Sequence, residues 1–330
     1  MNDTAISRAP ARTKIINFIS SYGSVIGIIL VLVVFQLIDN RFMRIQNIVG
    51  VLNSSTLLIV MSLAMMMVMS VRGIDLSVAQ VADATGVIAA MLIIAGKPFW
   101  LAIIVALLFG LVIGIFNCIL MSYLGIPAII GTLGMMFIVR SFELTLTKGA
   151  QPQILFTLPP GRTKQFFFIG QGSLGPVPML IVICFVIIVV MYFVKERSVL
   201  GRHMEAIEGN VRAAYLSSIR IRKVFGATFV FSSFLAAIAG IMLVSRSGNA
   251  VPRGVETYLT DCFVAVYIGT LVSKRNKFTV AGTVVGGALF VGFLSNFLTL
   301  RGMGAAYKSL FNGVFIIAAV ALGALQKNRK

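Results

Sequence analysis

Ten apolar runs follow one another along this chain, separated only by turn residues and short charged segments. The hydrocarbon core of a bilayer is about 30 Å thick, and a helix needs about 20 apolar residues to cross it. The runs are Tyr22–Ile38, Thr56–Val71, Val78–Ala95, Phe99–Tyr123, Ile126–Thr147, Val177–Val194, Val224–Ser245, Leu259–Val272, Phe278–Leu300 and Tyr307–Leu325. They predict an all-α, polytopic integral membrane protein with about ten transmembrane helices, in a single transmembrane domain over residues 1–330.

The composition excludes a water-soluble enzyme. Only 12% of the residues are charged and 58% are hydrophobic, whereas soluble domains carry about 25% charged residues. The net charge of +18 lies in short clusters between apolar runs, so we expect membrane lipid around the chain and no nucleic acid partner. Three cysteines and one histidine offer neither a disulfide framework nor a zinc site, and we expect no cofactor in this chain.

The basic residues predict the orientation, because Lys and Arg concentrate in cytoplasmic loops. With the N-terminus inside, 17 of the 28 basic residues fall in inner segments, 10 in outer segments, and Arg140 inside a span. Both termini are therefore expected in the cytoplasm. The first run is followed by Asp39, Asn40 and Arg41 instead of a signal cleavage site, so we expect it to remain a helix.

Three segments outside the spans stand out: a cytoplasmic tail (1–20), a periplasmic loop (148–176) and a cytoplasmic loop (195–223). In the periplasmic loop a strand-like stretch, Phe166–Ile169, precedes Gly170, Gly172 and Gly175, and Glu196 lies about 20 residues further on. This spacing matches a dinucleotide-binding fingerprint. Because a whole span separates Glu196 from the glycines, we interpret the glycines as a turn before a membrane helix.

The cytoplasmic loop contains a predicted short helix. Asn210 is a good N-cap residue for Val211–Ser217, with Ala213, Ala214 and Leu216 expected toward one face. Such a short helix needs something to pack on. The chain has no phosphate-binding loop, because Gly96-Lys97 is followed by Pro98, so it cannot hydrolyse ATP by itself.

Ionisable side chains inside a membrane are functional candidates by default. Asp83, close to Gln80, either faces a polar pathway or bonds to a neighbouring helix, and Asn117 leaves the same two alternatives open. Arg140 and Glu143 lie three residues apart, and we expect them to neutralise each other.

Two further expectations concern the ends and the packing of the spans. Asp261 lies near the outer end of its span and is expected to be solvated. The glycine pairs Gly23/Gly27, Gly110/Gly114 and Gly282/Gly286 predict close helix packing. The second and third spans are joined only by Arg72–Ser77, so this pair is a candidate for a broken or re-entrant helix.

Several stretches resemble a known family. They are Gly73–Val78, Gly125–Gly134, Ala206–Ala214, Gly282-Thr283 with Gly286 and Gly287, and Asn312-Gly313. In order and spacing they resemble the permeases of ribose-type ABC importers, within the branched-chain and sugar permease superfamily. The chain departs from the family pattern at Arg72 and Ala79, where the family usually has glycine.

The resemblance implies a subunit of the bacterial inner membrane that moves a sugar or sugar-like solute inward. It also implies three kinds of partner: a second permease subunit, identical or different; two cytoplasmic ATP-binding subunits or one fused ATPase, which use the ATP; and a periplasmic solute-binding protein. The ATPase-coupling loop would contain Gly209, Asn210, Arg212, Ala213, Ala214 and Leu216. The candidates for lining the solute pathway are Asp75, Gln80, Asp83 and Asn117.

Two other classes compete with this interpretation. An ion-coupled secondary transporter would use intramembrane carboxylates and broken helices, for which Asp83 and the Gly73–Ser77 break are the support. An intramembrane enzyme would cluster acids, His or Ser at the membrane face, but the single His203 lies in a basic inner loop.

Overall fold

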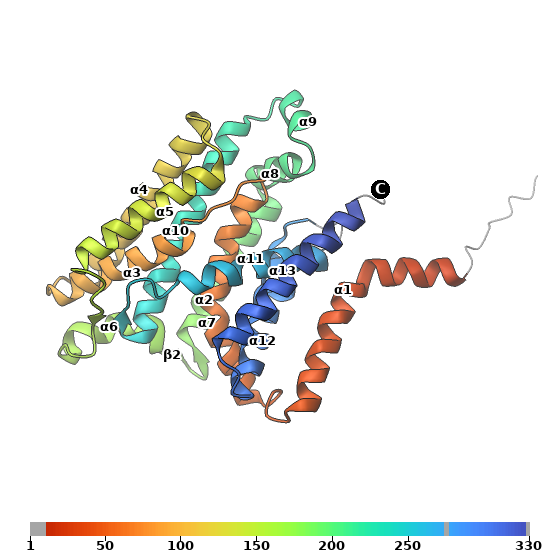
Figure 1. Cartoon of the computed structure of the whole chain (residues 1–330). Coiled ribbons are helices and arrows are strands. Elements are labelled where there is room, and N and C mark those ends of the chain that lie inside the picture. Colours follow the sequence, from red (N-terminus) through yellow and green to blue (C-terminus); the bar gives the residue numbers. More distant parts are fainter. Residues whose placement is uncertain (1–10, 274–276, 328–330) are drawn as a thin grey trace, which may run out of the picture.

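A computed structural model of the chain describes residues 11–273 and 277–327. Helices dominate the architecture (Figure 1). The α-helices are α1 (Ala11–Ile38), α2 (Ile45–Met69), α3 (Val78–Ile94), α4 (Phe99–Cys118), α5 (Ala128–Leu146), α6 (Pro160–Gln171), α7 (Met179–Tyr192), α8 (Val199–Gly209), α9 (Val211–Leu216), α10 (Ile221–Ser247), α11 (Glu256–Val272), α12 (Leu289–Leu300) and α13 (Ala305–Lys327). In the described part of the chain, π-helical segments extend them: η1 (Ile119–Tyr123), η2 (Phe193–Arg197) and η4 (Gly282–Ala288).

Four two-residue strands occur in the loops of the described chain. β1 (Gln153–Ile154) pairs antiparallel with β4 (Asn249–Ala250), with Gln153 opposite Ala250. β2 (Ser173–Leu174) and β3 (Val177–Pro178) form a hairpin directly before α7. Gly175 in the hairpin turn has a φ of 62°, a conformation that glycine adopts without steric cost. Gly175 thus lies in a turn before a membrane helix, as predicted, whereas Gly170 lies within α6.

Within the described residues, six helices are long and apolar enough to cross a membrane. They are Ile45–Met69, Phe99–Tyr123, Ala128–Leu146, Met179–Arg197, Ile221–Ser247 and Gly282–Leu300. Three shorter apolar helices are Val25–Ile38, Val78–Ile94 and Ala305–Ala318. The second predicted span started too late, because α2 begins at Ile45. The polar residues Asn53, Ser54 and Ser55 interrupt its apolar pattern without ending the helix.

α2 and α10 form the centre of the bundle. Every residue of α2 from Ser55 to Met69 is buried, as expected of a helix that is apolar on all sides. Met61, Met65, Met66 and Met67 are almost completely buried, and their flexible side chains fill irregular gaps between helices. α10 packs against α2, α3 and α4, whereas α4 and α7 expose many apolar side chains where lipid would surround the protein.

Close helix contacts depend on glycine. A Cβ atom at Gly110 of α4 would lie 2.6 Å from the Cβ of Ala237 in α10, and one at Gly114 would lie 2.9 Å from the Cα of Val230. A Cβ atom at Gly282 would lie 2.5 Å from the carbonyl oxygen of Gly269. The packing role predicted for these pairs is confirmed, because a methyl group would force the backbones apart. At Gly27 the structure instead leaves open space.

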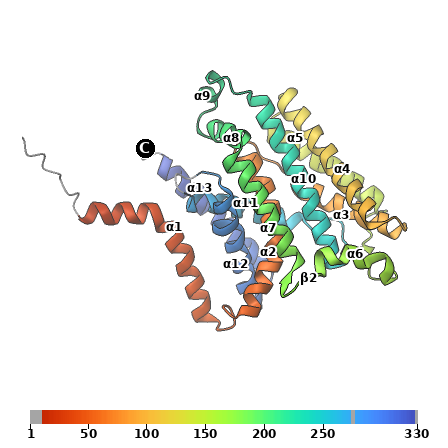
Figure 2. The same cartoon turned by 180° about the vertical axis from the view of Figure 1, so that it is seen from behind.

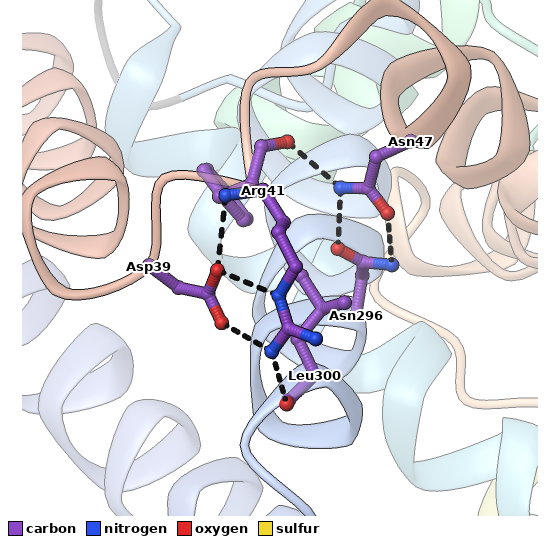
Figure 3. A network of polar contacts seen from close by, with 6 residues as sticks. Asp39, Arg41, Asn47, Asn296 and Leu300 are labelled. Carbon is purple, nitrogen blue, oxygen red and sulfur yellow. Dashed lines mark hydrogen bonds and ion pairs between the residues drawn. The ribbon is translucent and has the colours of Figure 1, made fainter.

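The first helix is fastened to the bundle by a polar network at its C-terminal end (Figure 3). The Arg41 guanidinium bonds to both carboxylate oxygens of Asp39, at 3.0 and 2.8 Å, and donates to the Leu300 carbonyl at the end of α12. Beside it, Asn47 and Asn296 exchange two amide hydrogen bonds. These hydrogen bonds from Arg41 lower the pKa of Asp39 to about 2. The network joins the α1–α2 turn to α12 across 259 residues of sequence.

The loop at 148–176 differs from expectation at one point. Phe166–Ile169 was expected to be strand-like, but it lies inside α6, whose first turn is started by Pro160. Gly170 packs on the end of α10, where a Cβ atom would lie 2.2 Å from the backbone nitrogen of Arg246. The apolar residues of this stretch have no period strong enough to distinguish a short surface helix from a strand.

The loops gather at two opposite ends of the molecule. α8 and α9 lie at the end toward which α13 runs, and α6 and the β2–β3 hairpin lie at the other end (Figures 1 and 2). Arg72 bonds to the last residues of α8, while the Gln171 side chain donates to the Arg246 carbonyl at the opposite end. Loops predicted to share one side of the membrane therefore contact each other. Which end faces the cytoplasm stays a prediction.

Candidate functional site

The centre of the candidate site is a helix break. α2 ends at Met69 and α3 begins at Val78, and the backbone of Gly73–Ser77 is not helical. The Thr132 hydroxyl of α5 accepts a hydrogen bond from the Leu76 amide at 3.1 Å. It also donates to the Ala128 carbonyl at 2.7 Å. Non-helical backbone is tolerated inside a membrane only where protein or a polar cavity covers it. The predicted break is confirmed, and neighbouring helices cover it.

A buried polar cluster fills the break. Asp75 accepts hydrogen bonds from the Ser77 hydroxyl at 2.6 Å, the Ser77 amide at 3.0 Å and the Ser232 hydroxyl of α10 at 2.8 Å. The Asn117 amide of α4 donates to the Ser77 hydroxyl at 3.0 Å. All four side chains are fully buried, and the Asn117 side-chain carbonyl oxygen has no hydrogen-bond partner among the described residues. The break thus ties α3, α4 and α10 together through polar contacts that would be costly to leave unpaired.

Gln80 and Asp83 lie further along α3 and make a second polar cluster. The Gln80 amide donates to the Glu143 carboxylate of α5 at 2.5 Å. The two Asp83 oxygens accept the Val255 backbone amide at 3.0 and 3.2 Å, directly before the N-terminus of α11. A carboxylate there satisfies a free amide and suits the positive end of the helix dipole. Of the two alternatives for Asp83, the structure has it bonded to a neighbouring element.

These four pathway candidates therefore fall into two buried groups. Asp75 and Asn117 share one cluster, and Gln80 and Asp83 lie in the other. The cavity beside Asp83 has a volume of about 10 Å³, which is room for at most a single water molecule. Within the described chain, all four side chains point into protein.

Two expectations for the other charged groups were wrong. Arg140 pairs with Glu256 of α11 at 3.3 Å, and not with Glu143, which bonds to Gln80 instead. Asp261 is buried, not solvated, and both of its oxygens bind side chains of α13, Lys308 and Asn312, each at 2.6 Å. Partners on other helices compete with an i,i+3 neighbour, and sequence spacing does not reveal them.

The second part of the candidate site is the α8–α9 hairpin at the end of the molecule. The Asn210 side chain accepts the amides of Arg212 and Ala213, at 2.9 and 3.1 Å, so the predicted N-cap is confirmed. The expected shared face is wrong. Ala214 is 3% exposed and packs inward, whereas Ala213 and Leu216 point outward, with Leu216 76% exposed. A six-residue helix turns far enough to put positions 214 and 216 on opposite sides.

Exposed apolar side chains cluster on the outer surface of α9. Val211, Tyr215 and Leu216 are 37, 70 and 76% exposed. Gly209 and Arg212, the remaining residues of the predicted coupling loop, are exposed as well. An apolar patch on a charged loop outside the membrane spans is typical of a protein contact site.

Carboxylates of α8 and η2 hold the start of the ninth apolar run. Glu208 accepts the Phe278 amide at 3.0 Å and lies 3.8 Å from the Lys195 ammonium. Glu196 accepts the Val280 amide at 2.9 Å, and Lys277 forms an ion pair with Glu205. Burial raises the pKa of Glu208, and the nearby Lys195 opposes that rise. The hairpin is thus bonded to a second segment that precedes a membrane helix.

Sequence reasoning missed several members of the site. Ser77 and Ser232 are buried and bonded to Asp75, and Thr132 is buried and bonded to the Leu76 amide of the break. Their polar side chains within apolar spans were the only signal available. The hairpin contacts of Arg72, Glu196 and Glu208 join segments far apart in sequence, and no local pattern marks them. Within residues 11–273 and 277–327, no group of three or more His, Cys, Asp or Glu side chains could hold a metal ion.

Comparison with known proteins identifies the family. The family model for the permease component of branched-chain amino acid transport systems matches residues 47–320. The chain belongs to this permease family. It is a multi-pass protein of the inner membrane. The region that matches the family model includes the helix break, both polar clusters and the α8–α9 hairpin.

Several curated relatives align over nearly the whole chain. The ribose import permease protein RbsC of Haemophilus influenzae is 30% identical over 303 residues, covering 92% of this chain and 93% of the relative. The L-arabinose ABC transporter permease protein AraH of Azospirillum brasilense is 28% identical over 328 residues, covering 99% and 94%. The D-allose transport system permease protein AlsC of Escherichia coli is 27% identical over 310 residues, covering 93% of each. No solved structure gave a significant match to this chain.

Proposed function

We propose that this chain is the permease subunit of an ABC importer that moves a sugar or sugar-like solute inward. The observation that carries the proposal is the similarity over more than nine-tenths of the chain to permeases named for ribose, arabinose and allose. No phosphate-binding loop occurs in the sequence. The energy is therefore supplied by separate subunits that bind and hydrolyse ATP.

The proposal includes a topology of about ten spans with both termini in the cytoplasm. The excess of basic residues in the inner segments supports this orientation. The contacts of Arg72 and Lys277 with α8 support it too, because these two residues come from predicted inner loops other than the one that contains α8.

The α8–α9 hairpin is the proposed docking element for the ATPase. Support comes from the exposed apolar side chains of α9 and from the polar cap of Asn210, which fixes the helix without any partner. Two ATP-binding subunits, or one fused ATPase, bind to a pair of permease subunits in this arrangement. A periplasmic binding protein delivers the solute at the opposite end, beside α6.

Asp75, Gln80, Asp83 and Asn117 form the rigid polar framework beside the solute pathway. Their burial within one chain supports a role in shaping the wall of the pathway. The break at Gly73–Ser77 gives this wall backbone groups that a continuous helix would not offer.

Uptake by reconstituted vesicles tests the proposal. The permease, its ATPase and its binding protein are assembled in lipid vesicles, and accumulation of radiolabelled ribose, arabinose and allose is followed. We expect accumulation of at least one sugar to require ATP and the binding protein, and to persist when an ionophore collapses ion gradients. Accumulation driven by an ion gradient without ATP would refute the proposal and establish a secondary transporter.

A further inference from the structure

Arg72 joins the helix break to the hairpin. Its guanidinium donates two hydrogen bonds to the Glu208 carbonyl, at 3.2 and 2.9 Å, and one to the Gly209 carbonyl at 3.0 Å. These carbonyls belong to the last turn of α8, where backbone acceptors lack helical partners and the dipole favours a cation. The planar fork of arginine can hold two acceptors at once, which a lysine ammonium does less well.

The backbone at Arg72 is held in an unusual conformation. Its φ is 63°, in the left-handed region that residues other than glycine seldom adopt. The Arg72 amide donates to the Met69 carbonyl at 3.0 Å and the Gly73 amide to the Val68 carbonyl at 3.0 Å. A Cβ atom at Gly73 would lie 2.7 Å from Val68. The backbone of residues 72 and 73 is therefore packed tightly against the end of α2. A displacement of the Arg72 side chain would consequently move this backbone with it.

The same short segment leads directly into the buried cluster. Asp75 lies three residues after Arg72 and is bonded to Ser77 and to Ser232 of α10. The Leu76 amide, which lies between Asp75 and Ser77 in the sequence, donates a hydrogen bond to the Thr132 hydroxyl of α5. A displacement of the Arg72 side chain consequently reaches side chains of α5 and α10 through a few residues that are all held by hydrogen bonds.

Glu208 contacts two membrane segments through different groups. Its carbonyl accepts from Arg72, and its carboxylate accepts the Phe278 amide at 3.0 Å. Glu196 of η2, which precedes the hairpin, accepts the Val280 amide. The Glu208 carboxylate therefore attaches the hairpin to Phe278 and to Lys195 of η2, whereas the last carbonyls of α8 attach it to Arg72 and so to the break.

We propose that Arg72 is a positioning residue for transport, which transmits movement of the α8–α9 hairpin to the break at Gly73–Ser77 and the Asp75 cluster. The proposal rests on the proposed function, in which the hairpin docks on the ATPase. When ATP binding moves the hairpin, the guanidinium moves the break with it. Energetic coupling between distant sites can be carried by a chain of packed side chains and hydrogen bonds of this kind.

The test compares uptake with ATP hydrolysis in the reconstituted complex. Arg72→Gly removes the guanidinium and relieves the positive φ, so it is the substitution least disruptive to the backbone. We expect the ATPase to co-purify with this variant and to hydrolyse ATP at the wild-type rate. Loss of three charge-assisted hydrogen bonds should lower sugar uptake per ATP hydrolysed by about tenfold. Arg72→Lys keeps the charge but lacks the planar guanidinium. Its uptake per ATP hydrolysed should lie between the values of the wild type and of Arg72→Gly.

Lys148 supplies a matched control. It is basic and has a φ of 51°, and within residues 11–273 and 277–327 its side chain makes no hydrogen bond or ion pair. It lies after α5, at the end of the molecule away from the hairpin. Lys148→Gly should leave uptake per ATP hydrolysed at the wild-type value.

Three results separate the proposals. Wild-type uptake per ATP in both Arg72→Gly and Arg72→Lys would overturn the role of Arg72. Loss of ATPase association in Arg72→Gly would overturn it as well, because Arg72 would then build the docking surface and not transmit movement. If the wild-type complex itself showed no ATP-driven uptake, the proposed function would fail, and the role of Arg72 with it.

Discussion

Leu216 of α9 offers the sharpest test of the docking surface. Its side chain is 76% exposed in the isolated chain, so docking against the ATPase would bury most of its apolar area. Complete burial of a leucine side chain contributes about 1.5–3 kcal/mol. Leu216→Glu removes that contribution and brings a charge to a packed contact, which adds a desolvation cost. The dissociation constant for the ATPase should rise by about ten- to a hundredfold, because each 1.4 kcal/mol is tenfold in affinity.

The assay is binding of the purified ATPase to the permease in lipid nanodiscs. Leu174→Glu is the control, because Leu174 is similarly exposed, at 64%, but lies in the β2–β3 hairpin at the opposite end. It should leave the affinity unchanged. Ala214→Glu is unsuitable, since Ala214 is buried against the chain and a charge there would disturb the hairpin itself. Equal affinity for wild type and Leu216→Glu would show that α9 is not the docking surface.

The remaining predictions concern orientation, the start of α11 and the attachment of α1. In a background without native cysteines, Lys223→Cys should be protected from a membrane-impermeant thiol reagent in intact cells, whereas Lys164→Cys should react with it. The reverse pattern would contradict the predicted topology. Asp83→Ala should lower the free energy of unfolding in detergent by about 1–3 kcal/mol, because a buried amide loses its acceptor, while Asp83→Asn should keep most of the stability and the transport; equal melting temperatures for the two variants would argue against this role. The pKa of Asp39 in the folded protein is lowered to about 2, so its pairing with Arg41 should stabilise the protein fully above about pH 4 and lose this effect toward pH 2. The melting temperatures of Asp39→Asn and of the wild type should therefore differ at pH 7 and converge in acid. A difference in melting temperature that is independent of pH would refute the pairing.

The sequence predicted features that depend on local patterns. Asn210 precedes a short helix and caps it, and Gly110 and Gly114 pack against α10. The break before α3 also followed from residues next to each other in sequence. In each case the physical cause acts within a few residues or through the size of a single side chain.

Pairings between distant elements could not be predicted in the same way. Arg140 of α5 forms an ion pair with Glu256 of α11, and Asp261 forms one with Lys308 of α13. These partners are set by how α5, α11 and α13 pack, which depends on the whole core. The inward side of Ala214 likewise depends on where the hairpin meets α10. A single sequence reveals that an intramembrane charge needs a partner, but it does not identify which partner is nearest.

The central claim is that ATP hydrolysis by partner subunits drives sugar import through this permease. The most direct measurement is the ATPase rate of the complete complex in sealed vesicles, with and without the sugar-loaded binding protein on the side of α6 and with ion gradients abolished. We predict that the loaded binding protein raises the rate and that sugar accumulates in step with it. An ATPase rate insensitive to the loaded binding protein, with sugar accumulating only when an ion gradient is restored, would contradict the account.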